Sequence, residues 1–230
     1  MPLTILYRDE HYVAIDKPPG LLVHRSPISR DRVFALQTLR DQLGRHVYPI
    51  HRLDRATSGV LLFGLSADAA RRLVAQFERQ AVDKEYLAVV RGWVDTHGFI
   101  DHPVADDHGN GIPQPARTRF RCLARVELPF AVDRYPTCRY SLVAVHPETG
   151  RRQQIRKHFK HISHHLVGDT THGNGRHNRF FREQIGIRRL LLMSHRLSFL
   201  HPFSGGWVTV AASADPDWIR AGRLFDYPVD

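Results

Sequence analysis

The sequence predicts an α+β fold, because short β-prone runs alternate with amphipathic helical segments along its 230 residues. Composition supports a globular chain with a substantial core, since 42% of the residues are hydrophobic and 24% are charged. The chain also shows neither an internal repeat nor a flexible linker. A single domain over residues 1–230 is therefore the simplest organisation.

The N-terminal part predicts a hairpin, a helix and a central strand. Ile5–Tyr7 and Tyr12–Ile15 are β-prone runs joined by a polar turn. Leu21–Val23 follows a Pro-Pro-Gly breaker and is expected to form another strand. Apolar residues at helical spacing predict a helix over Val33–Leu43. Gly59–Leu65 is almost wholly apolar, which predicts a buried central strand.

The remainder of the chain continues the mixture of strands and helices. Ser66 is expected to cap a helix that continues through Ala69–Gln80. Gln153–His164 predicts a basic helix. Residues 101–117 predict a long surface loop, and residues 170–189 an irregular or partly helical segment. Further strands are expected at Glu85–Arg91, Tyr140–Val145, Leu190–Met193 and Trp207–Ala211.

Charge is distributed unevenly along the chain. Lys and Arg number 33 against 23 Asp and Glu, a formal net charge of +10. Residues 1–115 carry 14 basic and 14 acidic side chains, whereas residues 116–230 carry 19 basic and 9 acidic ones. Most of the cations are arginines, whose planar fork suits phosphate. A neutral half joined to a basic half indicates a nucleic-acid partner.

Several classes of site are not favoured by the sequence. Cys122 and Cys138 are too few for a disulfide framework or a four-cysteine zinc site, and they suit a reducing cytoplasm. The histidines at 158–165 lack the spacing of a metalloprotease helix, and Gly173–Gly175 lacks the lysine of a phosphate loop. No apolar run approaches the length of a membrane span. We therefore expect no metal ion, no cofactor and no membrane.

The strongest chemical signal is a carboxylate among arginines. Asp54 lies between Arg52 and Arg55, directly before the predicted central strand. Neighbouring cations favour the ionised form of a carboxyl group, which can act as a nucleophile or a base. On composition alone, a turn in which the aspartate simply pairs with an arginine is also compatible.

The run at residues 51–59, HRLDRATSG, resembles the H-R-L-D-x-x-T-S-G signature of the RluA family of pseudouridine synthases. Three further segments resemble motifs of that family in the same order: Asp16–Gly20, Lys84–Tyr86 and Thr149–Arg156. Gln153 departs from the pattern, because the family usually has His there. Since Gln does not titrate near neutral pH, we assign no acid–base role to it.

The resemblance implies the pseudouridine synthase catalytic core, a mixed and mainly antiparallel β-sheet flanked by helices and loops. It implies isomerisation of a uridine in RNA, with Asp54 as the catalytic carboxylate. It assigns substrate contacts to Arg52, Tyr86, Ile155 and Arg156. Arg52 would enter the RNA stack where the target base has left, Tyr86 would stack on the uracil, and Arg156 would pair with Asp54.

The resemblance also bears on the RNA partner. The expected RNA-binding residues are Arg55, Arg151, Arg152, Arg188 and Arg189. The catalytic motifs begin near the first residues, so no N-terminal RNA-binding domain of the S4 type is expected. The segments 23–31 and 177–190 resemble family members that modify uridine 65 in the T-stem of tRNA. We expect a cytoplasmic monomer that needs no protein partner.

Other functions stay open on the sequence alone. A minimal synthase of this family could act on another tRNA stem-loop or on ribosomal RNA. A non-catalytic RNA-binding protein or RNA chaperone would not need a carboxylate placed among phosphates. A nucleoside or sugar hydrolase usually needs two carboxylates beside the scissile bond. No second acidic residue stands out in a matched motif.

Overall fold

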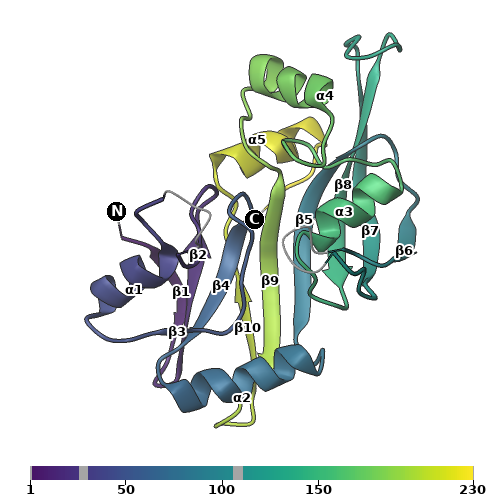
Figure 1. Cartoon of the computed structure of the whole chain (residues 1–230). Coiled ribbons are helices and arrows are strands. Elements are labelled where there is room, and N and C mark those ends of the chain that lie inside the picture. Colours follow the sequence, from purple (N-terminus) through teal and green to yellow (C-terminus); the bar gives the residue numbers. More distant parts are fainter. Residues whose placement is uncertain (1, 26–30, 106–110, 230) are drawn as a thin grey trace. The chain divides into compact units, whose positions relative to one another are not determined.

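The computed structural model describes residues 2–25, 31–105 and 111–229, drawn in Figure 1. The chain folds as two compact units. Unit 1 comprises residues 1–84 and 193–213, and unit 2 comprises residues 85–192 and 214–230. Parts of the segment 23–31 and of the predicted loop 101–117 lie outside the described residues. The single domain expected over the whole chain stays a prediction.

Unit 1 is built on a mainly antiparallel sheet. Its strands run in the order β1–β2–β4–β9, with β3 paired to β4 and β10 paired to β9. Among the strand pairings described in this unit, the short pairing of β4 with β9 is the parallel one, at Ser58 with Met193 and at Gly59 with Ser194. The strand bounds are β1 (Thr4–Arg8), β2 (Tyr12–Lys17), β3 (Tyr48–Pro49), β4 (Ser58–Gly64), β9 (Leu192–Leu200) and β10 (Trp207–Ala211).

The predicted hairpin, central strand and second helix of unit 1 are confirmed. Every residue of β4 is buried, as its unbroken apolar sequence indicates. Helix α2 (Ala67–Glu78) packs against β3 and β4 (Figure 1). Ser66 caps it, because the Ser66 Oγ accepts a hydrogen bond from the Ala69 N–H at 3.1 Å. Its buried face consists of two alanines and Leu73.

The prediction of a strand at Leu21–Val23 is wrong. These residues instead accept hydrogen bonds from the first turn of helix α1 (Ala35–Leu43). The carbonyl of Leu22 accepts from Ala35 N at 2.9 Å, and that of Val23 accepts from Leu36 N at 3.0 Å. The first N–H groups of a helix have no partner within it, so the preceding segment satisfies them here. The helix starts two residues later than expected, because Phe34 is extended and Val33 is exposed.

Unit 2 contains an antiparallel sheet in the order β5–β8–β7–β6. The strand bounds are β5 (Asp83–Arg91), β6 (His97–Asp101), β7 (Arg117–Leu128) and β8 (Cys138–Pro147). The helix bounds are α3 (Gln154–His161), α4 (Gly175–Phe180), the π-helical turn η1 (Phe181–Ile185) and α5 (Pro216–Leu224). The predicted strands at β5 and β8 are confirmed, as is the partly helical character of residues 170–189. Helix α3 contacts β8 (Figure 1).

Four elements were not anticipated from the sequence: β3, β6, β7 and α5. Signals for two of them were present. The first residues of β7 alternate between exposed and buried positions, in step with Arg117, Arg119 and Arg121. Helix α5 has Asp215 as its N-cap and Pro216 in its first turn, which is a standard start signal.

The bounds of β9 and α3 differ most clearly from the expected ones. Strand β9 begins two residues after the expected start and continues to Leu200. Helix α3 ends three residues early, before Ser163 takes a positive φ of 64°. Among the described residues, no helix has the length and apolarity to cross a membrane.

Replacing Gly59 should destabilise unit 1 strongly. Its φ is +101°, and a Cβ there would lie 2.2 Å from the carbonyl oxygen of Ser194 on β9. Gly59→Ala should lower the free energy of unfolding by roughly 2–5 kcal/mol, from backbone strain and overpacking together. Gly44→Ala is a matched control, since Gly44 also has positive φ but no atom lies within 4 Å of its added Cβ. The control should cost only about 1–2 kcal/mol. Urea titrations of both variants measure the difference, and equal losses would contradict the close approach of β9.

Candidate active site

Asp54 lies in the loop between β3 and β4 of unit 1. The loop closes as a turn, since the Thr57 N–H donates to the Asp54 carbonyl at 3.1 Å. Leu53, Thr57 and Ser58 are buried, whereas Asp54 is partly exposed. The buried residues on both sides hold the loop against the core. Asp54 is thereby kept at a defined position in the loop before β4.

His51, the first residue of the motif, anchors this loop. Its Nε2 accepts a hydrogen bond from the Leu62 N–H at 3.1 Å, and its ring stacks on Phe77 with centroids 4.8 Å apart. Desolvation of the ring, and to a smaller extent the Lys84 ammonium, lowers the pKa of His51 to about 3. A neutral ring is required, because only an unprotonated Nε2 can accept from Leu62. The geometry thus gives His51 a structural role.

Residues of the Asp16–Gly20 motif also form hydrogen bonds to the loop that carries Asp54. Lys17 is fully buried, and its ammonium donates to the carbonyls of Pro18, Leu21 and Arg55 at 2.9, 2.8 and 3.2 Å. The Gly20 N–H also donates to the Arg55 carbonyl, at 2.8 Å. Three acceptors match the three N–H groups of an ammonium, which lets the charge stay buried.

The two arginines beside Asp54 differ in their surroundings. Arg55 donates through Nε to the Gly20 carbonyl and pairs through Nη2 with Asp31, both at 3.1 Å. Its side chain is still 59% exposed, so part of it remains accessible to RNA. Arg52 is exposed to solvent.

Gln154 organises the start of helix α3 in unit 2. Its Oε1 accepts from Thr149 Oγ1 at 2.7 Å and from Arg151 N at 2.9 Å. Its Nε2 donates to the Arg117 carbonyl and to Thr118 Oγ1, both at 2.9 Å. Gln154 is buried, so this full set of partners explains why Thr and Gln occur at this spacing in the motif. No role was predicted for Gln154 from the sequence.

Arg156 forms a buried two-pronged ion pair with Asp169. Its Nε and Nη2 donate to the two carboxylate oxygens, each at 2.7 Å, and the side chains are 6% and 1% exposed. The Asp169 Oδ1 also accepts from the N–H groups of Thr171 and His172 at 2.9 Å. Burial alone would raise the pKa of Asp169, but the hydrogen bonds from Arg156 and the backbone outweigh it and lower the pKa. The sequence alone did not reveal this pairing.

Gln153, the departure from the family pattern, has a defined partner. It precedes α3 with a left-handed φ of 56°. The Nε2 of His172 donates to its Oε1 at 2.8 Å. The same segment that carries Asp169 is thus joined to α3 at a second point.

The other predicted substrate contacts of unit 2 lie on β5 and α3. Tyr86 is partly exposed on β5, opposite Val145 of β8. Ile155 is buried in the first turn of α3, next to Arg156. Tyr86, Ile155 and Arg156 therefore belong to unit 2, whereas Asp54 and Arg52 belong to unit 1.

The remaining predicted RNA contacts fall into two groups. Arg151 and Arg188 are exposed, and Arg152 is partly exposed. Arg189 differs, because it pairs with Asp215 and also donates to the Leu190 carbonyl. Its side chain is only 9% exposed. This geometry favours a structural role for Arg189 and leaves Arg188 as the accessible cation of the two.

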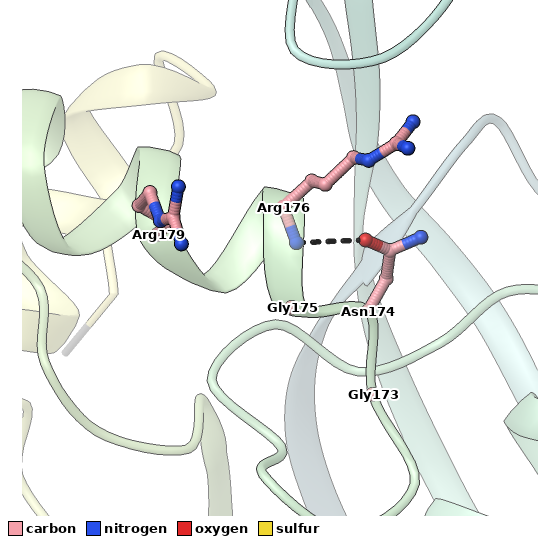
Figure 2. Close-up of a pocket in the computed structure, with 5 residues that line it drawn as sticks. All are labelled: Gly173, Asn174, Gly175, Arg176 and Arg179. Atoms are coloured by element: carbon pink, nitrogen blue, oxygen red, sulfur yellow. Dashed lines mark hydrogen bonds between the residues drawn. The ribbon is translucent and has the colours of Figure 1, made fainter.

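An open pocket in unit 2 is lined by residues around the start of α4. Figure 2 shows the Arg176 N–H donating to Asn174 Oδ1, a bond of 3.0 Å, with the Arg179 side chain one turn further along the helix. The lining residues are Gly173, Asn174, Gly175, Arg176 and Arg179. They include two guanidinium groups but no carboxylate and no aromatic ring. The pocket thus contributes none of the groups that the resemblance assigns to uridine chemistry.

Comparisons with known proteins agree with the family resemblance seen in the sequence. The pattern of the family described as RNA pseudouridylate synthase matches residues 11–161. A protein of Pasteurella multocida named tRNA pseudouridine synthase C is 46% identical over 240 aligned residues, covering 100% of this chain and 99% of its own. One of the same name from Yersinia pestis is 48% identical, covering 94% and 88%. The solved structure of human RNA Pseudouridylate Synthase Domain Containing 1 superposes with a TM-score of 0.74 at 25% identity, covering 97% of this chain and 87% of its own.

Removing the His51 ring should flatten the pH dependence of stability. The folded pKa is about 3, whereas an unfolded histidine titrates near 6.5. Unfolding therefore takes up a proton between these values, and the native protein loses stability as the pH falls through this window. In His51→Asn, the slope of unfolding free energy against pH should decrease by up to about 1.4 kcal/mol per pH unit. Urea unfolding at several pH values between about 4.5 and 7.5 measures the slope. Identical slopes would show that His51 is not the group that titrates.

Proposed function

The chain belongs to the RNA pseudouridylate synthase family, and on that premise we propose that it converts a uridine of tRNA, uridine 65 in the T-stem, into pseudouridine. The observation that carries the proposal is Asp54, held on a braced loop within an intact family signature. Curated relatives that share 42–48% of its residues over nearly all of the chain are named tRNA pseudouridine synthase C. A cytoplasmic monomer without a protein partner suits this reaction.

The reaction is an isomerisation, so no atom is gained or lost. The bond from uracil N1 to ribose C1′ breaks, and a bond from uracil C5 to the same C1′ forms. The proton on C5 is lost and N1 gains one. A carboxylate such as Asp54 can attack the ribose or remove a ribose proton to start this exchange. The net conversion requires neither an oxidant nor an activated donor.

The target base must leave its helix before it can react. Extruding a base costs a few kcal/mol of lost stacking. Tyr86 supplies a flat platform for the uracil while it turns, and stacking of this kind contributes about 1–3 kcal/mol per base. Arg52, which is exposed, enters the position that the base has left. Ile155 adds an apolar contact to the uracil.

Arg156 carries the positive charge that the family resemblance assigns as the partner of Asp54. A guanidinium has five N–H donors, and the contact with Asp169 uses its Nε and one N–H of Nη2. A charge enclosed by substrate needs such a partner, since an uncompensated buried charge costs about 3–5 kcal/mol.

Asp54→Asn should abolish pseudouridine formation and keep tRNA binding. Asparagine has nearly the same shape but can neither attack as a carboxylate nor accept a proton readily. The assay incubates each protein with an unmodified tRNA transcript and measures pseudouridine, with binding followed separately. Asp41→Asn on α1 is the matched control, because Asp41 is 67% exposed and pairs only with its exposed neighbour Arg40 among the described contacts. Full activity in the Asp54 variant would exclude the mechanism. Binding without turnover in the wild-type protein would instead favour an RNA chaperone.

The modified position is tested by mapping. Chemical labelling of pseudouridine followed by reverse transcription should give one new stop, in the T-stem at position 65. The same assay on ribosomal RNA is the comparison. A stop at another tRNA position or in ribosomal RNA would overturn the assigned target while leaving the activity intact.

Substitutions of Arg188 and Arg189 should have different effects on tRNA binding and on stability. Arg188→Gln should weaken tRNA binding and reduce the slope of log K against log salt by about 1, as expected for the loss of one phosphate contact. Arg189→Gln should lower the melting temperature and leave the salt slope unchanged, because it breaks the pair with Asp215. Fluorescence titrations at several salt concentrations provide the slopes. A reduced slope in the Arg189 variant would contradict this division.

A further inference from the structure

Asp169 makes several hydrogen bonds in addition to its ion pair with Arg156. Its Oδ1 accepts from two backbone N–H groups at 2.9 Å, those of Thr171 and His172. Its own carbonyl accepts from Asn178 Nδ2 at 2.7 Å. The Oδ1 of the same Asn178 accepts from Gly168 N at 2.8 Å. Side chain and backbone of Asp169 are thus fixed independently of Arg156.

The segment around Asp169 has no room to shift. Gly168 adopts a φ of +79°, and a Cβ there would lie 1.9 Å from the carbonyl oxygen of Arg189. Only glycine allows this approach. At its other end, His172 binds Gln153 at the start of α3, at 2.8 Å. The segment Gly168–His172 therefore forms a rigid support against the first turn of α3.

The contact that this support makes is directional. Both carboxylate oxygens meet Arg156 in a two-pronged geometry, at 2.7 Å each, which fixes the plane of the guanidinium as well as its position. A single point contact would leave the plane able to rotate. Because Nε and Nη2 face Asp169, the far edge of the guanidinium is turned away from it, in one defined direction.

We propose that Asp169 is a positioning residue for uridine isomerisation, which holds the guanidinium of Arg156 in the orientation that the reaction requires. The inference rests on the proposed function, since it assumes that Arg156 takes part in the reaction. Asp169 itself touches neither the substrate nor the reacting atoms. Its effect should appear in the chemical step, because misplacing a charged partner by about 1 Å can cost about 100-fold in rate.

The main test uses single-turnover rates of pseudouridine formation on a tRNA transcript, with tRNA affinity measured in parallel. Asp169→Asn keeps an oxygen for Thr171 and His172 but turns an NH₂ group toward Arg156. Its rate should fall by about 10- to 100-fold, with affinity changed by less than about threefold. Asp169→Glu keeps the charge and should recover part of the rate. A folded Asp169→Asn protein that reacts within twofold of the wild type would overturn the inference.

A double-variant cycle separates positioning from general destabilisation. Arg156→Lys keeps the positive charge but loses the two-pronged contact. If Asp169 acts through Arg156, adding Asp169→Asn to Arg156→Lys should slow the reaction by no more than about threefold. Multiplicative losses would overturn the inference. Should Asp169→Asn fail to fold, Asn178→Ala removes the backbone support alone and should still slow the chemical step by about 3- to 10-fold. A wild-type rate in that variant would also overturn it.

Asp9→Asn is the matched control. The Oδ1 of Asp9 likewise accepts from two backbone N–H groups, those of His11 and Tyr12, both at 2.7 Å. Asp9 lies in unit 1 and pairs with His201 rather than with an arginine. It should lose stability without slowing the reaction. Wild-type protein that makes no pseudouridine would refute the proposed function itself, which distinguishes that failure from a failure of the role of Asp169.

Discussion

The buried ammonium of Lys17 makes the hydrogen bonds that hold the loop carrying Asp54 in place. It has no exposed surface, and three backbone carbonyls take its three N–H groups. One of these carbonyls belongs to Arg55, immediately after Asp54. A buried charge without partners would be prohibitively costly, so the chain around Lys17 can adopt very few arrangements. The need of the Lys17 ammonium for hydrogen-bond partners thereby restricts the position of Asp54.

Unit 2 uses buried charge in a related way. Arg156 and Asp169 are both enclosed, and each satisfies the other through two short hydrogen bonds. Such a pair need not add net stability compared with an apolar pair of similar volume. Its value here is orientation, because a guanidinium held on two prongs cannot turn. In each unit, a buried charged group thus fixes the geometry of its neighbours: Lys17 in unit 1 and the Arg156–Asp169 pair in unit 2. The free energy of folding comes mainly from the apolar sheets.

The division of roles among the motif residues follows from their surroundings. His51, Lys17 and Gln154 form hydrogen bonds within the protein that hold the backbone in place. Arg52 is exposed and Tyr86 partly exposed, as suits groups that meet a substrate. A shared motif therefore mixes residues that build the site with residues that use it. Exposure distinguishes the two classes better than the spacing of the motif does.

Local patterns in the sequence predicted the α+β class and the buried strand β4, and they singled out Asp54 as the candidate catalytic carboxylate. Each depends on local pattern: an apolar run, a capping serine, or a signature confined to a few consecutive residues. Other features became visible only in the folded structure. The carbonyls of Leu22 and Val23 accept hydrogen bonds from the first residues of α1, Arg189 pairs with Asp215, and Asp169 pairs with Arg156. These facts depend on which backbone and side-chain groups meet after folding. Hydrogen-bond partners distant in the chain leave no periodic trace in the sequence, so composition and spacing could not reveal them.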